Sequence, residues 1–353
     1  MNPTNPTETE AEEKAPPAVE EAIDRLCAGE DLDVEQAEAL FAAIVDGTLD
    51  EAPLAGFLVA LKAKGEAAAE LIGAARALRA AAEPFPRPDI LFADTCGTGG
   101  DRSGTINVST AVAFAAAACG LPVVKHGNRS ITSRCGSADV LERLGARIDL
   151  PALEARRVLD ASGVCFLFAP QYHPGMRHAG PVRRALRVRT IFNMLGPCLN
   201  PAAPPVQLVG VADPRLIEPI ARTLQNLGCG SALVVHGGGL DEIALHTETM
   251  AMRVRDGTIE ALTITPEQAG LPRASIEPLA GGDPEENARR LRAVLGGTGS
   301  EAERGMVAIN TGALLMTAGL ADDLRTGTQA AMGVLDDGRA LARLDAFVAA
   351  SRG

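Results

Sequence analysis

The sequence predicts an α/β protein, with a small all-helical N-terminal domain followed by a larger α/β domain that has a mostly parallel central sheet. Two observations predict this class. From about Val19 to Ala82 the apolar residues recur with a helical period, and after a proline-rich connector short apolar runs typical of buried strands alternate with helical segments. The chain has 353 residues, of which 46% are apolar, and this is enough for two domains with a substantial core.

The helical domain is predicted over residues 19–83. Asp33 opens a capping-box arrangement ahead of an amphipathic helix, and two further helices follow it. A proline cluster at residues 84–88 ends the helical pattern and forms a stiff connector. Helices near residues 174–190 are expected to join this domain. Residues 1–18 are acidic and rich in proline and threonine, without the features of a signal peptide, and are predicted to be a disordered tail.

The α/β domain is predicted over residues 89–353. The apolar runs expected as buried strands are residues 90–93, 122–125, 164–168, 206–211 and 232–236. Helical stretches fall between them, and this alternation favours a parallel sheet that is covered by helices. Ligands of such folds bind at the carboxyl ends of the strands, where each unusual polar motif of this chain is found.

Composition excludes several classes of function. A formal net charge of −12 argues against a general nucleic-acid binder, because that work needs a basic surface. The seven cysteines are scattered and form no Cys-x-x-Cys pair, so a zinc or disulfide framework is not expected and a reducing compartment fits best. No apolar run reaches the length of about 18 residues that a membrane span needs. These features predict a cytoplasmic protein that contacts neither nucleic acid nor membrane.

The first polar motif is a glycine-rich loop from Asp94 to Thr110, placed between the apolar run 90–93 and an alanine-rich helix expected over 111–119. Glycines let the backbone curl so that successive N–H groups point inward, and the helix start adds further N–H groups. A phosphate site is therefore predicted, with a surface turn as the alternative. The loop is not a Walker loop, which ends in Gly-Lys-Ser/Thr, and Arg102 stands where a dinucleotide loop has its third glycine. Asp101 suggests contact with a sugar hydroxyl or a metal.

The second motif runs from Lys125 to Ser137 and also follows a predicted strand. It gathers three cations and four hydroxyl groups around two glycines, a combination that favours anions. A solvated basic loop is the alternative interpretation, and the position directly after a buried strand disfavours it.

The third motif, from Ala169 to Arg184, contains the only tyrosine of the chain and two of its five histidines. His173 and His178 have no carboxylate or cysteine at a suitable spacing, so metal binding is disfavoured. Contact with an acidic or aromatic substrate is the better interpretation, and a surface helix is the alternative.

The fourth motif is a glycine turn followed by two adjacent carboxylates, Asp241 and Glu242. Oxygen ligands of this kind can hold magnesium, which keeps several waters and often bridges to substrate phosphates. An exposed acidic turn is the alternative, but nearby phosphate loops favour the magnesium site.

Taken together, these motifs resemble the anthranilate phosphoribosyltransferase family of tryptophan biosynthesis. The segments that carry the resemblance, in the family's order, are Gly97-Thr98-Gly99-Gly100-Asp101, Asn107-Val108-Ser109-Thr110, Lys125-His126-Gly127-Asn128-Arg129-Ser130, Gly136-Ser137-Ala138-Asp139, His173-Pro174, Arg189-Thr190-Ile191-Phe192-Asn193 and Asp241-Glu242. The resemblance implies transfer of the phosphoribosyl group of 5-phosphoribosyl 1-diphosphate (PRPP) to the amino group of anthranilate. It also implies a helical domain joined to an α/β domain, Mg²⁺ as cofactor, and a homodimer formed through the helical domain.

The resemblance also implies roles for individual residues. Those expected to bind PRPP are Gly97, Gly100, Asp101, Thr105, Asn107, Val108, Ser109, Thr110, Lys125, Ser133 and Ser137. Those expected near anthranilate are Gly97, His126, Asn128, Tyr172, His173 and Arg183. The expected metal ligands are Ser109, Asp241 and Glu242, and the expected catalytic residues are Lys125, Asp241 and Glu242.

The sequence departs from the family pattern at two places. Ile131-Thr132-Ser133 stands where Val-Ser-Ser is frequent, and His246-Thr247-Glu248-Thr249 replaces a frequent Gly-Pro-Thr. Neither change removes an expected contact. Two other functions stay open from the sequence: a nucleoside phosphorylase of the pyrimidine type, and a non-catalytic paralogue that binds nucleic acid.

Overall fold

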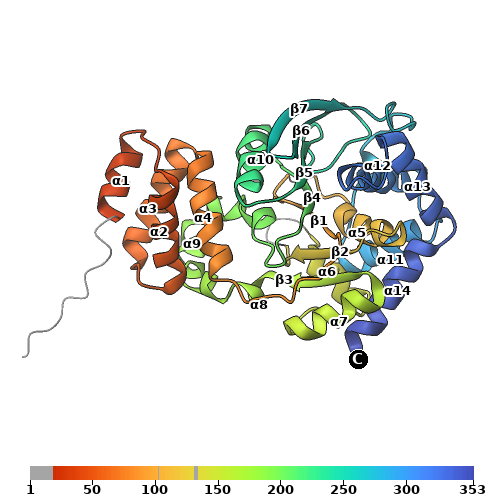
Figure 1. Cartoon of the computed structure of the whole chain (residues 1–353), viewed down its shortest axis with the longest axis horizontal. Coiled ribbons are helices and arrows are strands. Elements are labelled where there is room, and N and C mark those ends of the chain that lie inside the picture. Colours follow the sequence, from red (N-terminus) through yellow and green to blue (C-terminus); the bar gives the residue numbers. More distant parts are fainter. Residues whose placement is uncertain (1–18, 102, 131–133) are drawn as a thin grey trace, which may run out of the picture.

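The computed structural model describes residues 19–101, 103–130 and 134–353. The predicted tail 1–18, Arg102 and the segment 131–133, which includes the expected PRPP ligand Ser133, lie outside the described residues. The described chain has two parts, a helical domain and a larger α/β domain, as Figure 1 shows from left to right. This confirms the predicted fold class.

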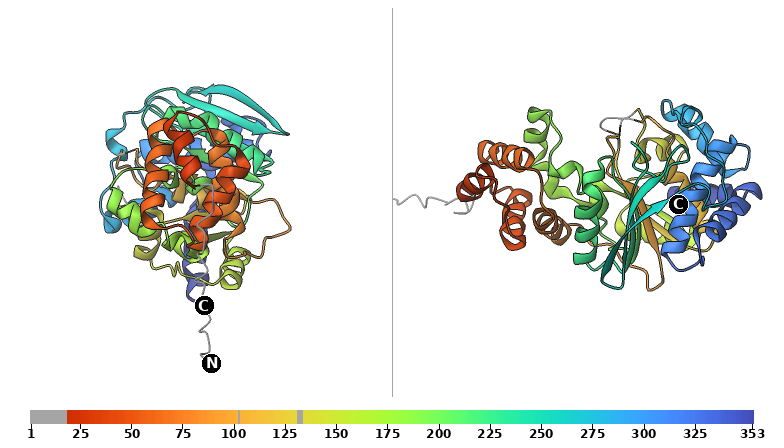
Figure 2. Two further views of the ribbon diagram at one scale, coloured as in Figure 1. Left: turned by 90° about the vertical axis from the view of Figure 1, so that its left-hand side faces the viewer. Right: turned by 90° about the horizontal axis from the view of Figure 1, so that it is seen from above.

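The helical domain is formed by α1 (Val19–Cys27), α2 (Val34–Asp46), α3 (Glu51–Lys64) and α4 (Ala68–Ala80). The predicted capping box is present, because the Asp33 carboxylate accepts a hydrogen bond from the Gln36 N–H at 2.8 Å and the Gln36 side chain accepts one from the Asp33 N–H at 3.2 Å. From the middle of the sequence α9 (Gly180–Leu186) packs against α3, and Val182 belongs to the same hydrophobic core. A right-angled view shows these helices as a bundle on one side of the α/β domain (Figure 2).

The α/β domain is built on a seven-stranded sheet of order β3-β2-β1-β4-β5-β6-β7. Its strands are β1 (Ala93–Gly97), β2 (Val123–Gly127), β3 (Val164–Phe168), β4 (Val206–Gly210), β5 (Ser231–His236), β6 (Thr249–Arg255) and β7 (Thr258–Ile264). Strands β1 to β5 are mutually parallel, as predicted. Strands β6 and β7 add an antiparallel edge that the apolar runs did not reveal, because buried residues in β6 are interrupted by exposed or half-buried ones and nearly all of β7 is exposed or half-buried.

The first strand lies further along the chain than predicted. The run 90–93 was expected to be a buried strand, but Ile90 and Leu91 are exposed and the strand begins at Ala93. Asp94, which opens the predicted loop, is instead a strand residue with β4 paired alongside it. The polar sequence hides this strand because its backbone is paired with β2 and β4, so tertiary contacts outweigh its low strand propensity.

Helices cover both faces of the sheet. They are α5 (Val108–Ala118), α6 (Ser137–Arg143), α7 (Ala152–Ser162), α8 (Ala169–Tyr172), α10 (Ile217–Asn226), α11 (Pro284–Leu295), α12 (Glu301–Thr317), α13 (Leu324–Asp336) and α14 (Arg339–Arg352). Successive residues of β4 face opposite sides: Leu208 joins the core under α5 and α12, whereas Val209 joins the core that the helical domain shares with α10. Within the described residues no helix is long and apolar enough to cross a membrane.

Candidate active site

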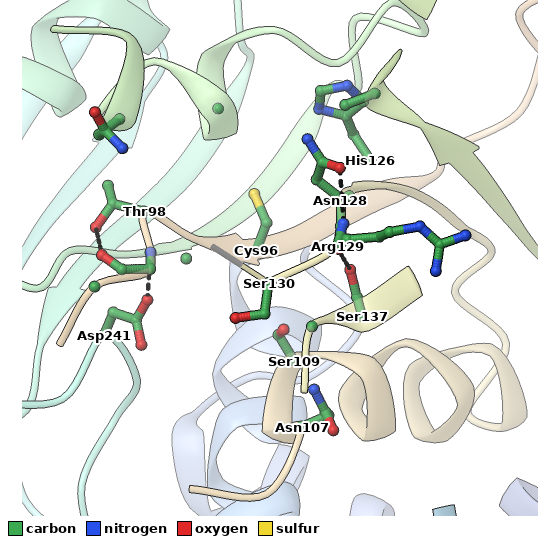
Figure 3. Close-up of a pocket in the computed structure, with 18 of the residues that line it drawn as sticks. Cys96, Thr98, Asn107, Ser109, His126, Asn128, Arg129, Ser130, Ser137 and Asp241 are labelled. Atoms are coloured by element: carbon green, nitrogen blue, oxygen red, sulfur yellow. Dashed lines mark hydrogen bonds between the residues drawn. The ribbon is translucent and has the colours of Figure 1, made fainter. Parts of the chain in front are cut away.

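A cavity of about 750 Å³ opens at the carboxyl ends of β1, β2 and β5. The strand order changes direction between β1 and β4, and this is where open α/β sheets bind ligands. The predicted site residues that line the cavity are Gly97, Gly100, Asp101, Thr105, Asn107, Val108, Ser109, Thr110, Lys125, His126, Asn128, Ser137, His173, Arg183, Asp241 and Glu242. Figure 3 shows Asn107 and Ser109 at the start of α5, Asn128 after β2 and Asp241 after β5 approaching this space from three segments.

The acidic turn after β5 is fastened to the glycine-rich loop. The Gly99 N–H donates to Asp241 Oδ2 at 2.8 Å, and the Ser109 N–H donates to Glu242 Oε1 at 3.1 Å (Figure 3 shows the first). Glycine is required on both sides of Asp241. A Cβ on Gly97 would lie 2.1 Å from Asp241 Oδ2, and a Cβ on Gly210 would lie 1.6 Å from the Asp241 carbonyl oxygen.

The carboxyl groups of the turn are held in an environment that disfavours their charge. Burial raises the pKa of Asp241, and the nearby Asp101 carboxylate raises it further. The pKa of Glu242 is raised well above its usual range by burial and then by Asp241, against the opposing effect of Lys125. Two adjacent carboxyl groups that repel each other are stabilised by a cation.

Lys125 lies beneath this turn with its side chain buried. Its ammonium group donates to the Thr95 carbonyl oxygen and to Ser109 Oγ, the latter at 3.2 Å. An ammonium group has three hydrogens, so a third donor remains for a ligand. Thr110, one residue beyond Ser109, has a buried hydroxyl with no hydrogen-bond partner among the described residues, and it also lines the cavity.

The second motif wraps around a carboxylate. Asp139 accepts hydrogen bonds from the N–H groups of Ser130 and Gly136, at 3.1 and 2.8 Å, and from the Arg129 guanidinium. The Asn128 carbonyl oxygen accepts from the Ser137 hydroxyl at 3.3 Å (Figure 3). These bonds hold the segment in a curled form with the Asn128 and Ser137 side chains at the cavity.

At the opposite end of the cavity the side chains are neutral or cationic. The rings of His126 and His173 meet edge to face with centroids 5.1 Å apart, and burial lowers their pKa values to about 3 and about 4. Arg183 stacks over the Phe192 ring at 5.1 Å. Among the described residues its guanidinium has no hydrogen-bond or ion-pair partner, and burial lowers its pKa. An anionic group in the cavity would supply the missing partner.

Tyr172 does not line the cavity. Its side chain is 2% exposed and belongs to the hydrophobic core of the α/β domain, although its neighbour His173 does reach the cavity. Helix α8 ends at Tyr172, and His173 after it has a non-helical backbone with φ −123° and ψ 63°, so the two side chains point in different directions. The expected contact of Tyr172 with anthranilate is therefore not supported.

Arg189 lines the cavity, although no role in the site was predicted for it from the sequence. Its guanidinium donates to the carbonyl oxygens of Gly100 and Gly99, at 3.1 and 3.2 Å, and thus ties the loop after α9 to the glycine-rich loop. The backbone of Gly100 has φ +79°, and a Cβ there would lie 2.4 Å from Arg189 Nη1. The sequence does contain Arg189 at the start of a segment that resembles the family. It does not indicate that Arg189 contacts the glycine-rich loop.

The acidic turn fits magnesium as a shared site. Among the described residues no group of three or more His, Cys, Asp and Glu side chains is arranged to hold a metal alone. Mg²⁺ needs no such cage, because one or two carboxylates with waters and substrate phosphates suffice. Asp241, Glu242 and the Ser109 hydroxyl offer oxygen ligands of this kind, and the repulsion between the two carboxyl groups would be relieved.

Comparison with known proteins places the chain. Residues 89–341 match the family described as "Glycosyl transferase family, a/b domain", and residues 20–82 match its helical bundle domain. An anthranilate phosphoribosyltransferase of Sorangium cellulosum (strain So ce56) is 61% identical over 330 residues, which cover 94% of this chain and 95% of the relative. The chain belongs to the anthranilate phosphoribosyltransferase family.

Other anthranilate phosphoribosyltransferases agree with this assignment. The enzyme of Serratia proteamaculans (strain 568) is 50% identical over 93% of this chain and 98% of its own length. The crystal structure of the Thermus thermophilus enzyme matches with a TM-score of 0.89 at 42% identity, over 94% of this chain and 99% of that one. A Saccharomyces cerevisiae structure "in complex with PRPP and Mg" shares the fold, with a TM-score of 0.87 at 24% identity over 95% and 98% of the two chains.

Membership of this family confirms the predicted family, enzyme class and reaction. It selects phosphoribosyl transfer to anthranilate over the nucleoside phosphorylase and the nucleic-acid-binding paralogue. The roles of individual residues stay predictions.

Proposed function

We propose that this cavity binds PRPP and Mg²⁺ at its acidic end and anthranilate at its histidine and arginine end. The observation that carries the proposal is the pair of backbone hydrogen bonds from Gly99 and Ser109 to Asp241 and Glu242. These bonds place the two carboxyl groups, which can bind a cation, directly beside the glycine-rich loop, which can bind phosphate. A diphosphate that carries a metal ion needs both kinds of group side by side.

The acidic end would bind the diphosphate and the sugar. The glycine-rich loop would offer backbone N–H groups and hydroxyls, including the unpartnered Thr110 hydroxyl, to phosphate oxygens. Lys125 would use its third hydrogen on the diphosphate. Asp101 accepts a hydrogen bond from the Ser103 N–H at 3.2 Å and lies beside Asp241, where it would contact a ribose hydroxyl or a metal-bound water. Further PRPP contacts are proposed at Gly97, Gly100, Thr105, Asn107, Val108, Ser109, Ser133 and Ser137.

The other end would bind anthranilate. The Arg183 guanidinium, without a partner among the described residues, would pair with the carboxylate of the substrate. Buried His126 and His173 remain neutral and would offer flat surfaces to the aromatic ring. Asn128 and Gly97 would complete the contacts between the two substrates.

The reaction breaks the bond from the anomeric carbon of ribose to the diphosphate oxygen and forms a bond to the amine nitrogen. The diphosphate leaves with the bonding electrons, and the nitrogen then loses a proton. An arylamine is neutral at pH 7, so no strong base is needed to start the attack. Bound magnesium would neutralise charge on the leaving group. The residues of the chain would act by positioning both substrates and by donating hydrogen bonds to the departing diphosphate.

We also propose a cytoplasmic homodimer with domain boundaries at residues 19–83 and 89–353. The seven cysteines are scattered along the chain and form no Cys-x-x-Cys pair, and this favours a reducing compartment. The dimer is an expectation from the family resemblance, in which the helical domain forms the interface. Light scattering of the purified chain should give twice the mass of one chain; a monomer at micromolar concentration would exclude the dimer.

The assay that tests the proposed function follows anthranilate fluorescence in the presence of PRPP and magnesium. We expect the signal to fall with time, and to remain constant when PRPP or magnesium is left out. A constant signal with all three present, across pH and salt, would overturn the proposed function.

A further inference from the structure

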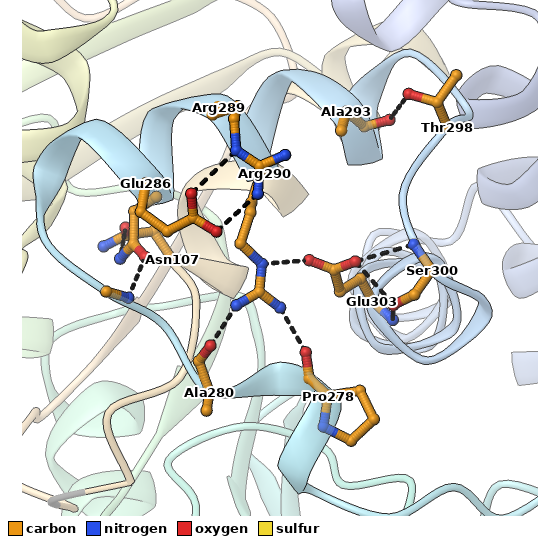
Figure 4. A network of polar contacts seen from close by, with 12 residues as sticks. Asn107, Pro278, Ala280, Glu286, Arg289, Arg290, Ala293, Thr298, Ser300 and Glu303 are labelled. Carbon is orange, nitrogen blue, oxygen red and sulfur yellow. Dashed lines mark hydrogen bonds and ion pairs between the residues drawn. The ribbon is translucent and has the colours of Figure 1, made fainter.

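Behind the glycine-rich loop lies a polar network from α11 and α12 that contributes little to the cavity wall (Figure 4). The loop pairs there with a short segment that follows the 3-10 turn Glu277–Leu279. The Ile106 N–H donates to the Leu279 carbonyl oxygen at 2.9 Å, and the Gly281 N–H donates to the Gly104 carbonyl oxygen at 2.6 Å. The segment 279–281 therefore backs residues 104–106 of the loop, as a strand backs its neighbour.

Arg290 holds this backing segment in place. Its guanidinium donates to the carbonyl oxygens of Pro278 and Ala280, and its Nε donates to Glu303 Oε1 at 2.7 Å. The Glu303 carboxylate is held in turn by the N–H and hydroxyl of Ser300, at 2.8 and 2.7 Å, at the start of α12. Arg290 and Glu303 are both largely buried, with side chains 13% and 9% exposed, so this pair anchors the segment to a helix end.

Asn287 lies one turn before Arg290 on α11 and reaches the loop itself. Its Nδ2 donates to Asn107 Oδ1 at 3.0 Å, and its Oδ1 accepts from the Gly282 N–H at 2.8 Å. Asn287 is 2% exposed, and it packs so closely that a Cβ on Gly281 would lie 2.9 Å from its Oδ1. It joins the backing segment to the side chain of Asn107.

The contact determines how Asn107 presents its amide. Asn107 Oδ1 accepts from Asn287, and Asn107 Nδ2 donates to the Cys135 carbonyl oxygen at 3.1 Å, so the amide cannot rotate without losing both bonds. Each of the two atoms keeps one further hydrogen-bonding position. Asn107 lines the cavity at the start of α5 (Figure 3), so a fixed amide gives a ligand there a defined donor and acceptor.

We infer that Asn287 is a positioning residue for PRPP binding: it fixes the Asn107 amide, and the Arg290–Glu303 pair holds it and the backing segment in register. The inference rests on the proposed function, since it assumes that PRPP occupies the glycine-rich loop. It concerns PRPP alone, because the network contacts the loop and the Cys135 segment and not the end of the cavity that carries Arg183.

Asn287→Asp tests the inference with the smallest change of shape. It keeps the acceptor for the Gly282 N–H and replaces the donor to Asn107 by a second oxygen. We expect the KM for PRPP to rise about tenfold, with the KM for anthranilate within about twofold of the wild type, since one hydrogen bond to a substrate-binding amide is lost. Asn226→Asp adds the same charge at an exposed site on α10, beside Arg76, and should leave both constants unchanged.

Asn287→Ala removes the same donor without adding a buried charge, and it carries the same expectation if Asn287→Asp does not fold. Thermal unfolding of each variant shows whether it folds. The comparison of the two KM values then tests the role, because a purely structural role would not affect one substrate more than the other. Equal rises in both KM values, or unchanged values in a folded variant, would overturn the inference.

Titration calorimetry with PRPP and magnesium, without anthranilate, separates the two proposals. The proposed function fails if the wild type shows no turnover in the anthranilate fluorescence assay. If the wild type and Asn287→Asp bind PRPP with equal Kd, the inference fails, whatever the turnover. A Kd raised about tenfold in the variant supports it.

Discussion

The two ends of the cavity both contain ionisable groups that are largely shielded from water, and this shielding shifts their pKa values in opposite senses. At the acidic end burial raises the pKa values of Asp241 and Glu242, so their charged forms are disfavoured. At the other end burial lowers the pKa values of His126 and His173, so these rings stay neutral. Loss of solvent therefore favours a bound cation at the acidic end, whereas the histidine end is stable without a cation.

The difference teaches how one cavity can bind two unlike substrates. A polyanion with its metal ion suits the acidic end. There the two carboxyl groups can bind the metal, and lysine and backbone N–H groups can donate hydrogen bonds to the phosphates. A flat aromatic acid suits the end where neutral rings meet one guanidinium that lacks a partner among the described residues. The proposed transfer then runs from the first end to the second, and each prediction below changes one end and leaves the other intact.

The largest effect is expected from Asp241→Asn combined with Glu242→Gln. Turnover should fall at least about a hundredfold, because the proposed metal ligands lose their charge. The metal-free protein should become more stable to denaturant at pH 7.5. The two groups bind protons more tightly in the folded state than in the unfolded state, and the ionised forms therefore oppose folding at this pH.

Turnover and urea unfolding, each with and without magnesium, measure both effects. Asp213→Asn is the matched control, because Asp213 is paired with Arg215 away from the turn and its pKa is lowered. Unchanged turnover and an unchanged magnesium titration in the double variant would show that the metal binds elsewhere.

The next effect concerns the other end. Arg183→Ala should raise the KM for anthranilate about thirtyfold, the loss expected for a hydrogen-bonded charge pair, and should leave the KM for PRPP within about twofold. Arg183→Lys keeps the charge without the planar fork and should recover only part of the loss. Arg222→Ala, which removes an exposed arginine paired with Glu218, is the control. Equal changes in both KM values would show that Arg183 does not bind anthranilate specifically.

The third effect is on stability rather than on activity, and it concerns the histidine pair. Their folded pKa values of about 3 and about 4 lie below the unfolded value of 6.5, so below pH 6.5 the unfolded state binds more protons. This contribution to stability is present above pH 6.5 and is lost as the pH falls. At pH 5 the loss should be about 2 kcal/mol for each histidine.

Urea unfolding of the wild type and of His126→Gln with His173→Gln, between pH 5 and 7.5, measures this dependence. The variant should have a flatter profile than the wild type. Parallel profiles would mean that these rings titrate normally in the folded protein, and the neutral character of this end would be wrong.

Short contiguous motifs made much of the site predictable from the sequence. Glycine turns and adjacent carboxylates such as Asp241 and Glu242 can be recognised from a few consecutive residues. Their closeness in space could be predicted because each motif follows a strand of the same parallel sheet. The place of Tyr172 was not predictable because the chain leaves the helix between Tyr172 and His173, which sends one side chain into the core and the other to the cavity. Gly210 and Asn287 act through contacts with segments far away in the chain, and no local pattern announces such contacts. Strands β6 and β7 were not predicted because neither has a continuous run of buried apolar residues.

The contrast between the two ends is tested most directly by diffraction from crystals grown with PRPP and Mn²⁺ in place of Mg²⁺. We predict an anomalous peak at coordination distance from carboxylate oxygens of Asp241 or Glu242 and from phosphate oxygens, with the Arg183 end free of PRPP. A manganese peak away from the acidic turn, or PRPP lying against Arg183 and His173, would contradict the account.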